Sequence, residues 1–475
     1  MIGTASEALE RLTLPDCLLP AGSADAAVPV HATRKAGVAA LASFLGGHTG
    51  GWIAAAGFTG ASGEVCPVPD GEGRVAAVLF GLGSGDGPPS LLPGKLPGAL
   101  PPGTYRLDSG FDDLALASLA WALGAYRFGR YRAEESAPRR LVLSSAIDGD
   151  DVTRIADGVY LARDLVNTGP NDLGPAELAD AARAVATKHG AVFSEIVGEA
   201  LLADGFPLIH AVGVAATGER APRLIDIVWG DEGAPAITLV GKGVCFDTGG
   251  LDIKPSSGML LMKKDMGGAA NALALAHMIM DAGLPVRLRV LIPAVENAIS
   301  AAAFRPGDVF RSRKGITVEI GNTDAEGRLI LADALALAAE EKPALIVDLA
   351  TLTGAARVAL GPEVVPFYTR DDALAADLTA AGSRVADPLW RLPLWAPYIS
   401  MLDSRVADIN NAGSGGFAGS ITAALFMSRF VPDEVRWIHA DIYAWNPSSR
   451  PGRPEGGEAQ AVRALYALIA GGGLG

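Results

Sequence analysis

The sequence predicts an α/β protein with a small N-terminal α/β domain and a larger C-terminal α/β domain, in which helices cover a mixed sheet. The chain of 475 residues exceeds the size of one ordinary hydrophobic core. A Pro/Gly-rich stretch interrupts its first third at residues 85–103. Beyond residue 150, strand-like and helix-like runs alternate. We therefore predict domains at residues 1–150 and 151–475.

Short apolar runs and one long helical pattern predict the N-terminal domain. Residues 74–83 (RVAAVLFGLG) and 139–145 (RRLVLSS) predict strands, and residues 113–128 (DLALASLAWALGAYRF) predict a helix between them. These elements are typical of a small α/β domain, for which we expect a role in assembly or regulation.

The C-terminal domain begins with two predicted helices. Residues 152–167 form the first, the segment NTGPNDLGP breaks it, and the second begins at Pro175. Strands and helices then alternate, as expected of a sheet covered by helices. The predicted strands are residues 222–230, 236–243, 286–297 and 344–352, and the predicted helices are residues 268–283 and 326–341.

Composition narrows the class of protein. Hydrophobic residues make up 49% and charged residues 19%, which excludes a disordered chain, and no apolar run reaches the eighteen or so residues needed to cross a bilayer. The opening residues do not resemble a signal peptide, and Cys17, Cys66 and Cys245 are too few for a disulfide framework. We expect a cytoplasmic protein. The net charge of -14 makes nucleic acid an unlikely main partner.

Familiar catalytic motifs are missing from the sequence. It contains no HExxH, GxSxG, GxxxxGK[ST] or GxGxxG pattern. Its six histidines show no paired ligand spacing, so a zinc site built from histidines is not expected. A bound metal ion would therefore be held mainly by oxygen.

The stretch NTDAEGRLILADAL, residues 322–335, places Asp324, Glu326 and Arg328 at every second position before a helical pattern. If the first part is extended, the three side chains point to the same side and converge. Two carboxylates there favour a cation. The alternative for an isolated acidic pair is a charged turn that caps the following helix.

A second group of charged side chains follows the predicted strand that ends at Gly241, around glycine-rich turns. The group comprises Lys242, Asp247, Lys254 and Asp265. Considered alone, Lys242 could be an exposed surface lysine or a phosphate contact, and Asp265 could be an ordinary helix N-cap. The four carboxylates of the two stretches would repel one another in a single low-dielectric pocket. Two divalent ions would remove that repulsion.

Four motifs, in this order, resemble those of the leucyl aminopeptidase family of two-zinc cytosolic aminopeptidases. They are GKGVCFDTGGLDIKP, MKKDMGGAA, FRPGD and NTDAEGR. Further matches extend the resemblance over about residues 155–445. It implies hydrolysis of the N-terminal amino acid from peptides with a free N-terminus, by water activated between two divalent metal ions. It also implies a homohexamer.

The resemblance assigns roles to the charged residues. The implied ligands are Lys242, Asp247, Asp265 and Glu326 for one metal ion, and Asp247, Asp324 and Glu326 for the other. Lys254 becomes a catalytic cation, and Arg328 becomes the catalytic anchor of a bicarbonate ion. Zinc is the family's usual metal, and mixed lysine and carboxylate ligation also accepts manganese or magnesium. Lys242 must be neutral to bind metal, and both desolvation and a nearby cation lower the pKa of a lysine.

The resemblance places the substrate pocket around Met262, Thr351 and Gly354. Beside it, Tyr443 and Ala444 replace the Ala-Gly that usually follows the family's Asp-Ile, and a Pro/Arg-rich insertion comes next. A large ring at position 443 would narrow the pocket if it faces inward, whereas it would leave the pocket unchanged if it packs into the core or against the insertion.

Two other classes of function use similar residues. A magnesium-dependent phosphoryl-transfer enzyme also clusters carboxylates with lysine and arginine, but it should carry a glycine-rich phosphate loop. A non-catalytic or DNA-binding regulator would keep the fold without turnover. The complete ligand set and the acidic net charge favour the aminopeptidase.

Overall fold

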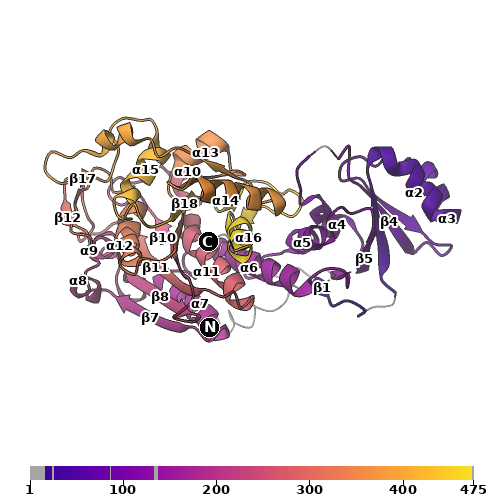
Figure 1. Ribbon diagram of the computed structural model, residues 1–475, viewed down its shortest axis with the longest axis horizontal. Helices are drawn as coiled ribbons and strands as arrows, with labels where there is room; N and C mark the ends of the chain where they lie inside the picture. The colour runs from indigo at the N-terminus through magenta and orange to yellow at the C-terminus, as the bar shows by residue number, and fades with distance from the viewer. Residues whose placement is uncertain (1–15, 24–25, 86, 133–136, 473–475) are drawn as a thin grey trace. The chain divides into compact units, whose positions relative to one another are not determined.

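The computed structural model describes residues 16–23, 26–85, 87–132 and 137–472 (Figure 1). The chain divides into two compact units. The N-terminal unit is Thr13–Tyr160 with Pro447–Glu455, and the C-terminal unit includes Leu161–Asn446 with Gly456–Gly475. The division falls inside helix α6 (Gly149–Asn167), a little beyond the junction predicted near residue 150.

A six-stranded sheet forms the centre of the N-terminal unit, in the order β1-β6-β5-β2-β4-β3. All neighbouring strands are parallel except β3 and β4. The strands are β1 (Leu18–Leu19), β2 (Val28–Thr33), β3 (Val65–Pro69), β4 (Val75–Gly81), β5 (Gly103–Ser109) and β6 (Arg139–Val142). The strands predicted at residues 74–83 and 139–145 are confirmed as β4 and β6.

The helices of this unit are α2 (Val38–Leu45), α3 (Gly47–Ala55), α4 (Leu96–Ala99) and α5 (Leu114–Ala125). The predicted helix at residues 113–128 is confirmed as α5, whose first turn is capped because the Asp113 carboxylate accepts the backbone N–H of Leu116. Trp121 of α5 is fully buried and packs against the Tyr105 ring, so α5 is anchored to β5 by an aromatic contact.

A nine-stranded mixed sheet forms the centre of the C-terminal unit, in the order β16-β15-β18-β14-β9-β11-β8-β7, with β10 paired to β11. The pairs that link β9, β10, β11, β14 and β18 are parallel, and β8 and β15 run antiparallel to β11 and β18. The strands are β7 (Val192–Val197), β8 (Arg223–Trp229), β9 (Ala236–Gly241), β10 (Gly243–Asp247), β11 (Arg287–Asn297), β14 (Leu345–Ala350), β15 (Val365–Tyr368), β16 (Leu389–Arg391) and β18 (Trp437–Asp441).

Helices cover both faces of this sheet. Val240 of β9 joins the hydrophobic core that α9 (Pro207–Gly213), α12 (Gly327–Glu340) and α15 (Gly419–Ser428) share. At the next residue, Gly241, an added Cβ would lie 2.9 Å from the Ala272 Cβ of α11 (Gly267–Asp281). Consecutive strand residues point to opposite faces, so α11 covers the face opposite α12.

The remaining helices and small sheets complete the C-terminal unit. Helix α16 packs on α11 and α14. The bounds are α7 (Pro175–Lys188), α8 (Ala200–Ala203), α10 (Ser256–Met259), α13 (Gly354–Leu360), α14 (Asp372–Arg384), α16 (Val462–Ala470), β12 (Val309–Arg311), β13 (Thr317–Glu319), β17 (Ile409–Asn410), β19 (Trp445–Asn446) and β20 (Gly456–Gly457). Over the described residues, no helix combines the length and the apolar character that a bilayer crossing requires.

The structure confirms the predicted α/β class and the mixed sheet. The strands predicted from residue 222 onward are β8, β9, β11 and β14, and the predicted helices are α7, α11 and α12. The segment Pro447–Glu455, which contains most of the Pro/Arg-rich insertion, belongs to the N-terminal unit.

Candidate metal centre and active site

The candidate site lies at the carboxyl ends of parallel strands in the C-terminal unit. Lys242 follows β9, Asp247 ends β10 and Thr351 follows β14. Because β9, β10 and β14 belong to the parallel part of one sheet, their carboxyl ends share an edge. Ligands of α/β proteins typically bind at such an edge.

Asp247 lies in regular secondary structure, which the sequence does not indicate. It was expected among glycine-rich turns, but it is the last residue of β10. Lys242 separates β9 from β10, and its backbone N–H donates to the Leu349 carbonyl at 3.0 Å. The short run of five residues therefore forms a strand that pairs with β11, which fixes the Asp247 carboxylate at the sheet edge.

Lys242 is buried at the centre of the cluster. Its Nζ lies 2.8 Å from Asp265 Oδ2 and 2.9 Å from Glu326 Oε1, and it donates to the Thr351 carbonyl at 2.9 Å. Burial alone would lower the pKa of Lys242, but the charges of Asp265 and Glu326 outweigh it and raise the pKa. The ammonium group thus supplies the positive charge that these carboxylates need.

The first residue of α12 makes room for Lys242. A Cβ at Gly327 would lie 2.5 Å from Lys242 Cε and 2.6 Å from its Nζ, closer than non-bonded atoms approach. A larger residue at this position would therefore push the end of the Lys242 side chain away from its present place beside Asp265 and Glu326.

We predict that Gly327→Ala displaces Lys242. The added methyl group should lower the free energy of unfolding by about 1–3 kcal/mol, as overpacking does elsewhere, and reduce the bound metal per chain. Gly354→Ala is the matched control, because Gly354 is the first residue of α13 and its Cβ would meet no atom within 4 Å. Chemical denaturation and elemental analysis measure both effects. Equal stability and metal content in the two variants would show that the close contact has no consequence.

Lys254 connects the two remaining carboxylates of the cluster. Its Nζ lies 2.8 Å from Asp247 Oδ2 and also contacts Asp324 Oδ1. The charges of Asp247 and Glu326 raise the pKa of Lys254 despite its burial. Lys254 is therefore a fixed cation beside the cluster.

Neutral side chains hold the carboxylates in place. The Asn297 amide donates to Asp247 Oδ1 at 2.8 Å and to the Thr323 carbonyl at 3.1 Å. The Thr351 hydroxyl donates to Asp265 Oδ1 at 2.8 Å. Neither Asn297 nor Thr323 stands out in the sequence, since an isolated amide or hydroxyl carries no spacing signal.

The acidic stretch at residues 322–328 is a turn that leads into α12, which corrects the predicted extended conformation. The Ala325 N–H donates to the Asn322 carbonyl at 3.2 Å, and Glu326 already has helical backbone angles, with φ -71° and ψ -35°, at the start of α12. The carboxylates of Asp324 and Glu326 consequently contact different lysines. The prediction that the three charged groups meet at one spot through alternation is wrong.

Arg328 is buried on α12 and its Nη1 donates to the Asn411 carbonyl at 2.6 Å. Its guanidinium carbon lies 6.0 Å from the centre of the Phe426 ring. Burial lowers the pKa of Arg328 to about 10. Its Nε is buried and has no hydrogen-bond partner among the described residues, so this nitrogen could donate to an anion.

The carboxylates of this site could hold a cation that carries more than the single positive charge of a lysine. Asp247, Asp265 and Glu326 are all buried, and one carboxylate oxygen from each lies within 4.8 Å of the others. Burial and the charge of Asp247 raise the pKa of Glu326 to about 8, and Glu326 Oε2 has no hydrogen-bond partner among the described residues. Oxygen ligands gathered in this way suit divalent ions. A cation would offset the repulsion between the carboxylates and would give Glu326 Oε2 a partner.

The residues expected to form the substrate pocket come from different elements of the C-terminal unit. Met262 begins the 3-10 helix Met262–Met266, and Gly354 begins α13. The Tyr443 ring contacts two basic side chains, with its centre 4.7 Å from Lys264 Nζ and 5.0 Å from the Arg357 guanidinium carbon. A small cavity beside this ring is also lined by Arg357, and neither Met262 nor Gly354 lines it.

The chain is similar to known metal-dependent aminopeptidases, which agrees with a metal site at these carboxylates. Residues 160–466 match the catalytic domain of the cytosol aminopeptidase family, and residues 28–144 match the N-terminal domain of M17 aminopeptidases. A probable cytosol aminopeptidase of Roseiflexus castenholzii is 43% identical over 73% of this chain and 74% of its own length.

Solved structures give the same result. The cytosol aminopeptidase of Coxiella burnetii superimposes with a TM-score of 0.91 at 48% identity, covering 96% of this chain and 99% of that one. The bottromycin maturation enzyme BotP, solved in complex with Mn, has a TM-score of 0.85 at 34% identity and covers 94% and 99%. The chain therefore belongs to the M17 family of cytosol aminopeptidases, metal-dependent hydrolases that remove the first residue of a peptide.

Proposed function

We propose that this chain removes the first residue of peptides with a free N-terminus at the centre formed by Lys242, Asp247, Asp265, Asp324 and Glu326. The observation that carries the proposal is the buried cluster of Asp247, Asp265 and Glu326, whose oxygens lie within 4.8 Å of one another around a lysine. Buried like charges are retained where they hold a cation or perform chemistry.

Two divalent ions would fit this centre. Asp265 and Lys242 would be ligands of one ion, and Asp324 would be a ligand of the other. Asp247 and Glu326 would be ligands of both. Zinc or manganese is the proposed metal, and magnesium suits the same oxygen ligands. Lys242 would bind as the neutral amine, because two added cations reverse the electrostatic balance that now raises its pKa.

When bound, these ions would supply Lewis acidity that lowers the pKa of water and a ligand position for the substrate's neutral amine. Lys254, held beside Asp247 and Asp324, would donate to the carbonyl oxygen of the scissile bond as negative charge develops there. Arg328 would hold a bicarbonate ion through its unpaired Nε, and such an ion would supply a base for the reaction. Asn297 and Thr351 would keep Asp247 and Asp265 oriented.

We predict that acetylation of the substrate's amino group abolishes cleavage. Acetylation converts the amine to an amide, whose nitrogen is a poor metal ligand, so the substrate loses its anchor. Hydrolysis of leucine anilide and of acetyl-leucine anilide by the same metal-loaded preparation measures the effect. Comparable rates on the two substrates would contradict an exopeptidase that recognises the free amine.

We predict that Tyr443→Ala favours bulky first residues. If the ring lines the pocket, its removal opens space, and the ratio of kcat/KM for leucyl and alanyl anilides should rise by roughly tenfold to two-hundredfold. Tyr131→Ala, an exposed tyrosine of the N-terminal unit, is the control and should leave the ratio unchanged. An unchanged ratio in folded, metal-loaded Tyr443→Ala would place the ring outside the pocket, where Lys264 and Arg357 hold it.

We further propose a cytoplasmic homohexamer in which residues 1–150 serve assembly or regulation. The names of the cytosol aminopeptidase relatives support the location. Leu260, Val358 and Phe417 of the C-terminal unit are 79%, 84% and 86% exposed, which supports contact with another chain. Light scattering should give the mass of six chains, and the mass of a single chain would contradict the assembly.

A further inference from the structure

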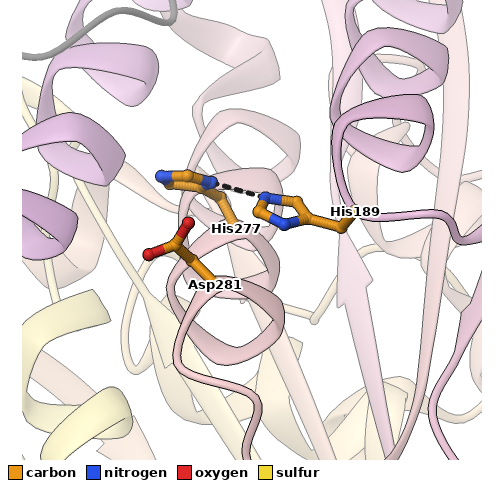
Figure 2. A group of neighbouring side chains, drawn as sticks. All are labelled: His189, His277 and Asp281. Carbon is orange, nitrogen blue, oxygen red and sulfur yellow. Dashed lines mark hydrogen bonds between the residues drawn. The ribbon is translucent and has the colours of Figure 1, made fainter.

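Two histidines far apart in the sequence meet at the C-terminal ends of α7 and α11. His189 Nε2 and His277 Nδ1 are 2.8 Å apart, although 88 positions separate the residues. Asp281 lies one turn beyond His277 on α11, a spacing that puts both side chains on the same face of the helix. Figure 2 shows the three side chains converging. One nitrogen from each histidine and one carboxylate oxygen lie within 4.8 Å of one another.

The local field at this cluster favours a cation. His189 is the C-cap residue of α7, and Asp281 is the last residue of α11. The C-terminal end of a helix carries partial negative charge, so two such ends add to the full charge of Asp281, which Lys188 partly opposes. Burial is the main cause that lowers the pKa of His189, which favours the neutral ring, the form that binds a metal ion.

The cluster is separate from the carboxylate centre. Helix α11 begins at Gly267, beside Asp265, and the ten residues from there to His277 advance about 15 Å along the helix axis. None of the three side chains has a role in the proposed peptidase reaction.

We propose that His189, His277 and Asp281 form a second metal site, which binds one divalent transition metal ion such as Zn²⁺. Two imidazole nitrogens and one carboxylate oxygen are a zinc donor set, and the exposure of Asp281 leaves a fourth position for water. On binding, the ring that donates the hydrogen bond between His189 and His277 changes tautomer, so that its proton moves to its other nitrogen and both facing nitrogens can bind the ion. The ion then links the ends of α7 and α11.

Binding requires only a small shift between the two ring nitrogens. Zinc–nitrogen bonds of about 2.0 Å at tetrahedral angles place two ligand nitrogens about 3.3 Å apart. The two ring nitrogens, now 2.8 Å apart, therefore need to separate by a few tenths of an ångström. His189 is only partly buried, so its ring can rotate by this amount without disturbing the core.

Metal counting tests the second site. Wild type, His189→Ala and His48→Ala are each dialysed to equilibrium against micromolar Zn²⁺, and bound zinc per chain is measured by elemental analysis. His48 is the matched control, since it is an exposed histidine of the N-terminal unit that bonds the Pro69 carbonyl. Zinc at the carboxylate centre contributes equally to all three proteins. Wild type and His48→Ala should each bind one more ion than His189→Ala, and equal counts in the three proteins would overturn the proposal.

A variant that keeps the hydrogen-bonding capacity separates metal binding from folding. Asp281→Asn preserves size and hydrogen bonding, and it should weaken zinc affinity at this site by about tenfold or more while leaving the circular dichroism spectrum unchanged. Anomalous diffraction at the zinc edge should show a peak between His189 and His277 in wild type. Unchanged affinity in Asp281→Asn, or no anomalous peak beside the two rings, would mean that the histidines share only a hydrogen bond.

Discussion

Lys242→Ala is expected to lose bound metal and, with it, peptidase activity. The alanine removes the one nitrogen ligand proposed for the carboxylate centre. It also leaves Asp265 and Glu326 buried without the ammonium group that lies 2.8 and 2.9 Å from them. Breaking a buried charge pair in this way typically costs about 3–5 kcal/mol, so the metal-free variant should be less stable by this amount. Elemental analysis and chemical denaturation measure the two effects.

The control for this substitution is Lys314→Ala. Lys314 donates to the Arg429 carbonyl at 2.7 Å, so its removal leaves no buried carboxylate uncompensated. We expect metal content and stability close to those of the wild type. A folded Lys242→Ala protein that keeps full metal content would show that Lys242 is not a ligand.

Lys254→Ala is expected to keep its metal but to slow hydrolysis by about a hundredfold to a thousandfold. This is the usual cost of removing one fixed donor that stabilises a developing oxyanion. Because the interaction would exist mainly in the transition state, kcat should fall with little change in KM. Single-turnover rates and bound metal per chain, measured on the same preparation, test the prediction.

Lys254→Arg refines this experiment. The arginine keeps the positive charge beside Asp247 and Asp324, so it should recover part of the rate that alanine loses. If Lys254→Ala loses metal while Lys242→Ala retains it, the roles assigned to the two lysines are reversed.

The main elements of the fold were predictable because they are long and strongly periodic. Helices α7, α11 and α12 and strands β9, β11 and β14 have clear apolar patterns bounded by glycine, proline or charged residues. Strand β10 escaped prediction because its five residues follow a lysine between two glycines, a pattern that looks like a loop. Its strand conformation comes from pairing with β11, which is a tertiary contact.

Some residues of the candidate site were also predictable from the sequence, and others were not. Carboxylates that follow a buried strand or precede a helix could be identified, since sheet edges and helix starts place polar groups predictably. The alternation expected at residues 322–328 does not occur, because the Asn322 carbonyl accepts the Ala325 N–H and closes a turn there. The contacts of Asn297 and the pairing of His189 with His277 depend on packing between distant segments, which local sequence does not encode.

Titration of the metal-free protein with metal tests whether the carboxylate centre binds the ions that hydrolysis requires. The chain is stripped with a chelator and Mn²⁺ or Zn²⁺ is returned in steps, while bound metal and hydrolysis of leucine anilide are followed together. We expect no turnover without metal. Activity should rise in wild type, but not in Glu326→Gln, as the carboxylate centre fills with two ions. Full turnover by the stripped protein would contradict this expectation.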